Sequence, residues 1–346
     1  MKCKAVAVRV RRGEEARRRL KESNLLNTDL LLKHTREELI LPLLPDADDS
    51  TVAEVLKGIR CRITEDVFER RPKRPKSYQD LLKLPPHLKE LLPTSYDIVG
   101  TIIILKLPEE LYPVREEIGE ALMQMHKGVK TVALDRGVRG RFRVRELEVI
   151  AGEKNFETTH VENQIKILVD VSKVYFSPRL AAERARVASL VREGEVVLDM
   201  FAGAGPFTVT IARLARPNKV IAVDINPDAY TYLERNIHIN HVEDVVEAYL
   251  GDAADVVPTI EDRVDRIVMN HPTEAIEFLE IALQKISPGG MIHLYTLLEV
   301  DMFKGAVLRV QEVAQRNLRD VKLSSVREVK GYSPSSSIFC FDLEVD

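Results

Sequence analysis

The sequence predicts an α/β fold in which a doubly wound, mostly parallel C-terminal domain follows two smaller α+β units. Strand and helix patterns alternate from residue 179 onward, which is typical of a parallel sheet covered by helices on both faces. Short strands with one helix occupy residues 96–178. Residues 69–95, with five prolines and many charges, separate that unit from residues 1–68.

The two N-terminal units are predicted from short periodic stretches. In residues 1–68, CKAVAVRV alternates like a strand, and RRGEEARRRLKESNLL has apolar residues at helical spacing. Residues 69–95 are predicted to be a linker with one short helix inside it. In residues 96–178, a helix that ends in glycine follows the apolar strand YDIVGTIIILKLP. Further strands are expected in KTVALD and FRVRELEVIAG, and a pair of strands in THVENQIKILVDV.

The C-terminal unit, residues 179–346, begins with the helical pattern RLAAERARVASLV. EVVLDM, KVIAVDI and RIVMN are predicted as buried strands, and FTVTIARLARP and DAYTYLERNIHIN as helices between them. The end of the unit differs, because MIHLYTLL and SIFCFDLEV are strands separated by one long helix, and no helix follows the second. We therefore expect the last strand to be inserted antiparallel.

Composition argues against several classes of protein. No run of about 18 apolar residues is present, so we expect no membrane-spanning helix, and the N-terminus lacks the apolar stretch of a signal peptide. The three cysteines, Cys3, Cys61 and Cys340, are scattered along the chain. This pattern favours the reducing cytoplasm and predicts neither disulfides nor a metal site.

Charge is unevenly distributed along the chain. The whole chain has a net charge of −3, yet residues 1–22, 57–76 and 126–145 carry +6, +5 and +6. The remaining residues are therefore strongly acidic. Three basic tracts on an acidic protein indicate a surface that binds a polyanion such as a nucleic acid, although each tract alone could be a solvated helix face.

A glycine-containing turn, LDMFAGAGPF, follows the first strand of the C-terminal unit. A dinucleotide-binding fingerprint would need a third glycine at Thr208, so the motif does not fit hydride transfer. Asp199 ends this strand, Asp224 ends the next, Asp252 follows the third strand region, and Asn270 follows the fourth. Polar groups at successive carboxyl ends of parallel strands line one crevice, where Asp224 is placed to accept hydrogen bonds from a ribose diol and Asp252 to meet an adenine amino group.

This ordered set resembles class I, Rossmann-like, S-adenosylmethionine-dependent methyltransferases, whose glycine loop is similar to FAGAGPF. Their cofactor, S-adenosyl-L-methionine, has no phosphate, which fits the missing third glycine. The resemblance implies a cofactor site formed by nine residues: Asp199, Phe201, Gly203, Gly205, Pro206, Asp224, Ile225, Asp252 and Asn270.

A narrower resemblance covers essentially the whole chain. VYFSPRLAAERARV, VVLDMFAGAGPF, AVDINPDA and VMNHP together resemble the archaeal and eukaryotic tRNA (guanine-37-N1) methyltransferases. The resemblance implies methylation of N1 of the guanine 3′ of the anticodon. It also implies an N-terminal domain that contacts the tRNA elbow and a middle domain, residues 96–178, that binds RNA near the anticodon stem-loop. We expect a monomer, because the tRNA itself can bridge the two ends of the protein.

The family also implies roles for individual side chains. Guanine N1 carries a proton, so methyl transfer needs a base and a cation that stabilises charge on O6. In this chain the base would be Glu183, and the cation Arg143, with Arg145 as the fallback and Arg179 nearby as a further substrate contact. Tyr175 would shape the pocket, while Asn270 and Pro272 would hold the guanine edge.

One departure leaves alternatives open. The family usually reads Asn-Leu-Pro-Lys where this chain has Asn270, His271, Pro272 and Thr273, and some relatives alkylate a wyosine precursor at the same nucleotide. That reaction, alone or as a second activity, is one alternative, and a different RNA or protein methyltransferase is another. Methyltransferases of amines favour an aromatic residue after Asn-Pro-Pro, which Thr273 does not provide. We interpret His271 as structural or solvent-facing rather than as a base.

Overall fold

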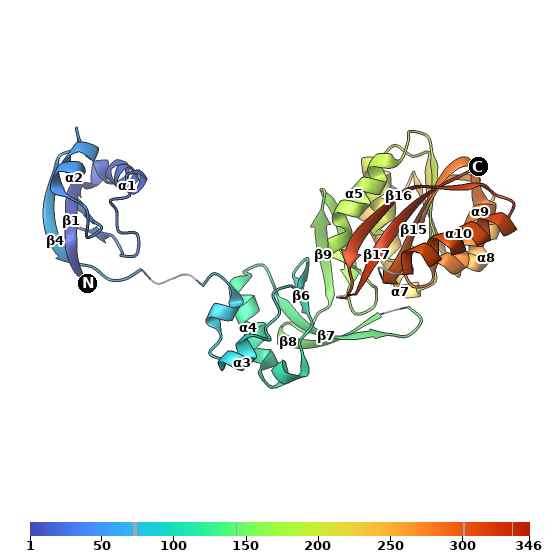
Figure 1. The fold of residues 1–346 in the computed structure, drawn as a ribbon, viewed down its shortest axis with the longest axis horizontal. Coiled ribbons are helices and arrows are strands. Elements are labelled where there is room, and N and C mark those ends of the chain that lie inside the picture. The colour runs from blue at the N-terminus through green and yellow to red at the C-terminus, as the bar shows by residue number, and fades with distance from the viewer. Residues whose placement is uncertain (72–74, 143, 300–301, 334) are drawn as a thin grey trace. The chain divides into compact units, whose positions relative to one another are not determined.

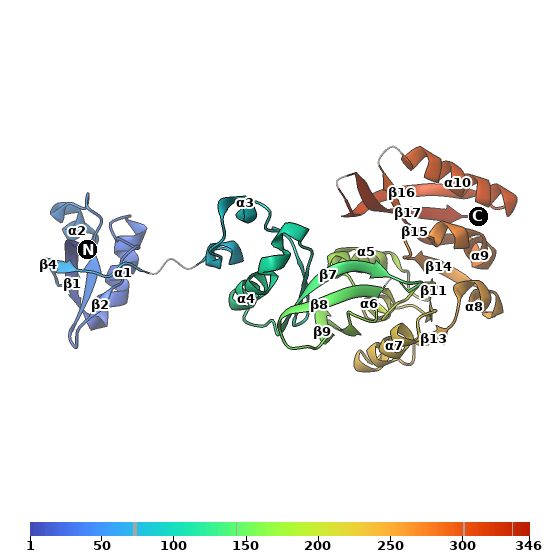
Figure 2. The same ribbon diagram turned by 90° about the horizontal axis from the view of Figure 1, so that it is seen from below.

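The structure is a computed structural model that describes residues 1–71, 75–142, 144–299, 302–333 and 335–346. It divides into two compact units, Met1–Lys76 and Ser77–Asp346, which are drawn in Figures 1 and 2. None of the described helices is both long and apolar enough to cross a membrane.

The first unit is the small α+β domain that the sequence predicts. Its sheet has the order β2-β3-β1-β4, and helices α1 and α2 pack on it through Leu20 and Val52, which are buried with Val6 and Leu41. The elements are β1 (Lys2–Arg9), η1 (Val10–Arg12), α1 (Gly13–Glu22), β2 (Lys33–His34), β3 (Glu38–Pro42), α2 (Asp49–Val55) and β4 (Cys61–Val67).

The second unit begins with a four-stranded sheet of order β5-β6-β7-β8, in which β6 and β7 are parallel and α4 connects them. The elements are η2 (Tyr78–Leu81), α3 (Pro86–Lys89), β5 (Asp97–Val99), β6 (Ile102–Leu105), η3 (Glu109–Val114), α4 (Arg115–Met125), β7 (Thr131–Arg139) and β8 (Val144–Gly152). Tyr78, Leu82 and Leu92 are buried in the core under this sheet. Much of the segment predicted to be a linker, 69–95, therefore packs onto the middle domain, because its apolar residues lie at positions where one face can be buried.

A separate hairpin, β9 (Glu157–Glu162) and β10 (Ile165–Asp170), lies against helix α7 (Pro227–Ile239). Asn236 and Asn240 each accept from one backbone N–H of β10 and donate to the carbonyl of the same residue, at Leu168 and Lys166 respectively. Asn236 and Asn240 are four residues apart, a rise of about 6 Å along a helix, and Lys166 and Leu168 are two residues apart, about 6.6 Å along a strand. The spacing of the two amide side chains therefore matches the spacing of the backbone groups that they contact. They satisfy an edge that would otherwise have unpaired backbone groups.

The C-terminal part is a seven-stranded sheet of order β13-β12-β11-β14-β15-β17-β16. Its strands are β11 (Val196–Asp199), β12 (Lys219–Asp224), β13 (Val246–Leu250), β14 (Val264–Met269), β15 (Ile286–Glu299), β16 (Val321–Gly331) and β17 (Ser336–Val345). The first five are parallel, and β17 is inserted antiparallel between β15 and β16, as the sequence predicts. The α/β class with a Rossmann-like domain is thus confirmed.

Strand β16 is absent from the sequence prediction, which has only a helix between the last two strands. The stretch VKLSSVREVKG is mostly exposed and polar because β16 is an edge strand with little to bury, so it lacks the apolar pattern that reveals a strand.

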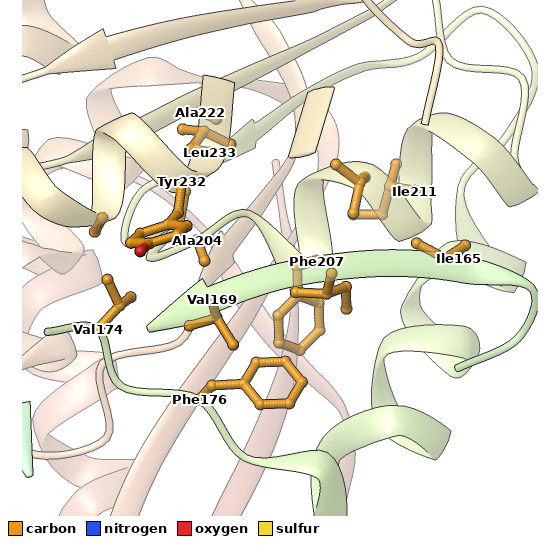
Figure 3. Close-up of a cluster of buried hydrophobic side chains, with 14 of the residues drawn as sticks. Ile165, Val169, Val174, Phe176, Ala204, Phe207, Ile211, Ala222, Tyr232 and Leu233 are labelled. Atoms are coloured by element: carbon orange, nitrogen blue, oxygen red, sulfur yellow. The ribbon is translucent and has the colours of Figure 1, made fainter. Parts of the chain in front are cut away.

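Helices cover both faces of this sheet, so its strands alternate between two cores. Val197 and Val220 face α5, α6 and α7, whereas Leu198 and Ile221 face α8, α9 and α10. Figure 3 shows the first core, where Phe207 of α6 lies near Phe176. The remaining helical elements are η4 (Pro178–Leu180), α5 (Ala181–Leu190), α6 (Pro206–Leu214), α8 (Ala253–Thr259), η5 (Ala275–Phe278), α9 (Leu279–Lys285) and α10 (Phe303–Arg316).

This organisation predicts that residues 77–346 fold without residues 1–76. Deleting 1–76 should shift the thermal midpoint of the remaining unit by no more than a few degrees, because each unit has its own core. A matched deletion of 1–95 also removes Tyr78, Leu82 and Leu92, and should lower the free energy of unfolding by at least about 4 kcal/mol. Equal stability of the two truncated proteins in a denaturant titration would contradict the assignment.

Candidate active site

A cavity of about 550 Å³ lies at the carboxyl ends of the parallel strands. Residues that follow β11, β12, β13 and β14 form one wall, and residues of β5, β6, β7 and β8 form another. Segments 174–180 and 330–332 also line it. The cavity is therefore shared by the middle and C-terminal parts of the second unit, as expected where a ligand must meet a second substrate.

The glycine turn forms the floor of this cavity. Gly203 and Gly205 have φ values of +58° and +80°, in the left-handed region that favours glycine. A Cβ on Gly205 would also overlap the side chain of Leu233. The turn leads directly into α6, with Pro206 in its first turn.

Asp224 closes the turn from the neighbouring strand. Its Oδ2 accepts from the Gly203 amide at 2.6 Å, and its Oδ1 accepts from the Asn226 amide at 2.9 Å. Burial raises the pKa of Asp224, while these backbone donors and His271 oppose that shift. A carboxylate that lines the cavity beside the glycine turn disfavours a phosphate there, so the site suits a nucleoside without phosphates.

Asp199 lies behind the cavity wall, fully buried. Thr208 Oγ1 donates to its Oδ2 at 2.8 Å, and its Oδ1 has no hydrogen-bond partner. Burial raises the pKa of Asp199 to about 7, and Asp224 adds to this effect. Thr208 occupies the position where a dinucleotide fingerprint would have glycine, and its hydroxyl donates the hydrogen bond to Asp199 instead.

Asp252 lies at the start of α8, where its Oδ1 accepts from the Ala254 amide at 3.0 Å. Its Oδ2 accepts from Arg141 at 2.6 Å. Arg141 belongs to the turn of the β7–β8 hairpin, so this ion pair connects the middle domain to the adenine end of the predicted cofactor site.

A cluster of alternating charges joins the middle domain to the VYFSPRL segment. Asp97 of β5 accepts from Arg179 at 2.6 Å and from Arg145 at 3.5 Å, and Arg145 also donates to Asp135 at 2.9 Å. Arg145 donates further to the Phe176 carbonyl. The guanidinium of Arg145 lies 5.4 Å from the centre of the Tyr175 ring, a cation–π distance.

Most of the predicted site residues come together. Eleven line the cavity: Arg145, Tyr175, Arg179, Phe201, Gly203, Pro206, Asp224, Ile225, Asp252, Asn270 and Pro272. Gly205 and Asp199 lie just behind the lining. Arg143 falls outside the described residues.

Glu183 does not line the cavity. It lies in α5, one helical turn after Leu180, which does line it, and only 6% of Glu183 is exposed. Its carboxylate is engaged by Arg186, at 2.6 and 2.8 Å, and by the Tyr295 hydroxyl at 2.8 Å.

Lys330, Tyr332 and Phe142 are among the cavity residues that were not predicted. Lys330 Nζ donates to Ser177 Oγ at 3.2 Å, and the rings of Tyr332 and Phe142 are 56% and 42% exposed. Lys330 belongs to β16, the strand that was not predicted, and Tyr332 to the turn after it. Phe142 stands in a predicted strand, but only the hairpin brings it to the cavity.

Comparisons with known proteins agree with this geometry. Family models match three successive parts of the chain: "tRNA methyltransferase 5 N-terminal domain" at residues 5–51, "TYW2 N-terminal domain" at 78–155 and "TRM5/TYW2 methyltransferase domain" at 158–323.

Individual relatives match over nearly the whole length. The tRNA (guanine(37)-N(1))-methyltransferase Trm5b of Pyrococcus abyssi is 41% identical, with 99% of this chain and 98% of that protein covered. The structure titled as the complex of aTrm5 and tRNALeu is 34% identical, with 99% of each chain covered and a TM-score of 0.82. A tRNA(Phe) (4-demethylwyosine(37)-C(7)) aminocarboxypropyltransferase of Pyrococcus horikoshii is 34% identical over 76% of this chain and 93% of its own.

The buried Asp199 predicts a specific dependence of stability on pH. Its folded pKa is raised to about 7, whereas an unfolded aspartate has a pKa near 3.9, so the folded protein binds the extra proton between these values. The free energy of unfolding should therefore fall as the pH rises from about 4 to about 7. Asp199→Asn should remove this slope and be the more stable protein above pH 7 in thermal unfolding. The exposed Asp244→Asn is the control, and equal slopes in the two variants would contradict the assignment.

Proposed function

Because the chain belongs to the TRM5/TYW2 methyltransferase family, we propose that it transfers a methyl group from S-adenosylmethionine to N1 of guanine 37 in tRNA. The observation that carries this proposal is the match, over essentially the whole length of both chains, to a protein named for that reaction. Related structures are titled as complexes with tRNALeu and with AdoMet, in agreement with both substrates.

The N-terminal unit favours guanine methylation over aminocarboxypropyl transfer. The aminocarboxypropyltransferase relative covers only 76% of this chain, whereas Trm5b covers 99% of it, and residues 5–51 match the N-terminal domain of tRNA methyltransferase 5. The basic tract at residues 1–22 lies in this unit, so we propose that it contributes to binding tRNA.

The cofactor site fits S-adenosylmethionine in three respects. Asp224 and Asp252 provide hydrogen-bond acceptors for a ribose diol and an adenine amine. Asp199 Oδ1 is buried without a hydrogen-bond partner and suits the methionine ammonium group, provided that the residues between Asp199 and the cavity move aside. The glycine turn leaves room for a ligand to approach the backbone at Gly203. The bound cofactor would supply an electrophilic methyl group on its sulfonium sulfur.

The acceptor side presents aromatic surface. Tyr175, Tyr332 and Phe142 reach the cavity from three different segments, and each is at least 42% exposed. Exposed rings at a cavity suit a purine that has left its stack, because enzymes that modify bases hold the extruded base against aromatic or apolar side chains. Asn270 and Pro272 line the same space, in the position proposed for the guanine edge.

The proposed reaction needs one group that accepts the guanine N1 proton and one that stabilises the negative charge on O6. Glu183 would accept the N1 proton, since it lies one helical turn from the lining and its other engagements are hydrogen bonds that it can exchange. Charge would build on O6. Arg145 is already neutralised by Asp97 and Asp135, so Arg143 remains the better candidate to stabilise that charge.

Nucleoside analysis tests the proposed reaction. Incubation with labelled S-adenosylmethionine and unmodified tRNA, followed by digestion, should yield 1-methylguanosine. A tRNA carrying adenosine at position 37 is the control and should remain unlabelled. Label only in a wyosine-type nucleoside, from tRNA that contains the precursor, would indicate the alternative branch, and label in protein alone would contradict the proposal.

Substitution of Glu183 tests the base. Glu183→Gln should slow single-turnover methylation by at least about 100-fold and flatten the acid limb of the pH–rate profile, with cofactor and tRNA binding nearly unchanged. Glu157→Gln is a matched control, because Glu157 also accepts from a tyrosine hydroxyl and an arginine but lies outside the cavity lining. A Glu183→Gln rate within a few-fold of the Glu157→Gln rate would remove Glu183 from this role.

A further inference from the structure

A buried hydrogen-bonded network connects Glu183 to the sheet beneath it. Besides Glu183 and Arg186 of α5, it contains His293 and Tyr295 of β15 and Cys340 and Asp342 of β17. Of these, Arg186 alone is more than 9% exposed, at 16% of its side chain. None of the six residues lines the cavity. Glu183 is the proposed base, and the other five have no role in the proposed reaction so far.

Tyr295 provides the contact between the sheet and Glu183. Its hydroxyl donates to Glu183 Oε1 at 2.8 Å, and its side chain is completely buried. Burial raises the pKa of Tyr295 well above its usual value, with Cys340 and Glu183 adding to the shift, so the hydroxyl stays protonated and acts as a donor. A donor in this position fixes the orientation of the Glu183 carboxylate through a hydrogen bond to a charged group.

Arg186 provides the opposite charge, and it is shared. Its Nε and one terminal nitrogen donate to the two oxygens of Glu183, and the other terminal nitrogen donates to Asp342 at 2.9 Å. Asp342 also accepts from His293 Nδ1 and Ser325 Oγ, both at 2.6 Å, and these donors with Arg186 lower its pKa against the effect of burial. Arg186 therefore keeps a carboxylate partner if Glu183 turns away, which avoids an unpaired buried cation.

His293 is held in one neutral form. Arg266 donates to its Nε2 at 2.9 Å, so the proton lies on Nδ1 and points to Asp342. Burial lowers the pKa of His293. His293, Cys340 and Asp342 are close enough to hold a metal ion, but they bond to one another and lie between Arg186 and Arg266, whose charges oppose a cation.

The network lies directly behind the cavity wall. Tyr295 pairs with Cys340 across β15 and β17, and the next pair on the same face, Leu297 and Ile338, lines the cavity. Phe207 also lines it, with its ring centre 5.7 Å from that of Tyr295. The Glu183 carboxylate thus lies about one residue layer from the space proposed for guanine.

We propose that Tyr295 is a positioning residue for methyl transfer, whose hydroxyl, together with the Arg186 guanidinium, holds the Glu183 carboxylate in place behind the cavity wall until guanine enters. This inference rests on the proposed role of Glu183 as base. The remaining contacts, of Arg186 with Asp342 and of Asp342 with His293, keep the network charge-paired after the carboxylate has moved.

The test compares Tyr295→Phe, which removes one oxygen atom, with the full-length parent in single-turnover methylation of unmodified tRNA from about pH 5 to 9. We expect the rate at neutral pH to fall about 10-fold and the acid limb to move to higher pH by about one unit, the size expected for one hydrogen bond to a charged group. Cofactor affinity should stay unchanged. Tyr232→Phe is the matched control, because it removes a 2.6 Å hydroxyl bond to Glu157 outside the cavity lining and should leave the limb in place.

Arg186→Lys is the second variant, because it retains the charge but lacks the planar fork that donates in parallel to the two oxygens of Glu183, and it should move the acid limb in the same direction. An acid limb that stays in place in both variants, while Glu183→Gln is inactive, would overturn the positioning role and leave the base intact. A Glu183→Gln protein as active as the parent would instead overturn the proposed function itself.

Discussion

The active site depends on one carboxylate that holds two arginines. Asp97 is 8% exposed and lies between Arg145 of the middle sheet and Arg179 of the segment that leads into α5. Of these two pairs, only Asp97–Arg179 connects the two walls of the cavity, because Asp97 and Arg145 both belong to the middle sheet. The Arg179 side chain is 45% exposed, so solvent screening reduces the contribution of this pair. Apolar packing joins the middle sheet and the C-terminal sheet as well, because Val99, Ile102 and Ile104 are buried in the same core as residues of the C-terminal sheet.

Carboxylates of the second unit differ in charge state because their surroundings differ. Asp199 is completely buried and its hydrogen-bond donors are uncharged, so its pKa rises to about 7, whereas Asp342 has the charged Arg186 as well as His293 and Ser325 as donors and a lowered pKa. In the proposed cofactor site, Asp199 would suit a ligand that brings a positive charge, whereas Asp342 already belongs to an ion-paired network. Burial and the charge of the donors distinguish the two carboxyl groups.

Sequence patterns predicted the parallel strands and the cofactor loop because short stretches of neighbouring residues determine both. Buried strands such as β11 and β12 are continuous apolar runs, and polar residues at their ends must meet at one edge of the sheet. The acceptor wall was less predictable. Lys330 lies on an exposed edge strand without apolar periodicity, and Tyr332 lies in the turn after it. The packing of Tyr78 and Leu92 on the middle sheet depends on tertiary contacts that no local pattern encodes. The partners of Glu183 lie 112 and 3 residues away in the chain, and spacing identifies only the nearer, Arg186.

The cofactor side of the site is preformed, whereas side chains on the acceptor side are engaged in hydrogen bonds within the protein. The glycine turn and Asp224 are fixed by backbone hydrogen bonds and left-handed glycines, so the cofactor side needs little rearrangement. On the acceptor side, Glu183 is bound by Tyr295 and Arg186, and Arg141 occupies an oxygen of Asp252. The Arg141 side chain is 70% exposed, so the phosphates of a polyanionic substrate can compete with Asp252 for it. Arg186 and Tyr295 are held behind the cavity wall, so release of Glu183 in the proposed mechanism requires the base to enter the cavity, and the reactive geometry then forms only when the RNA is present.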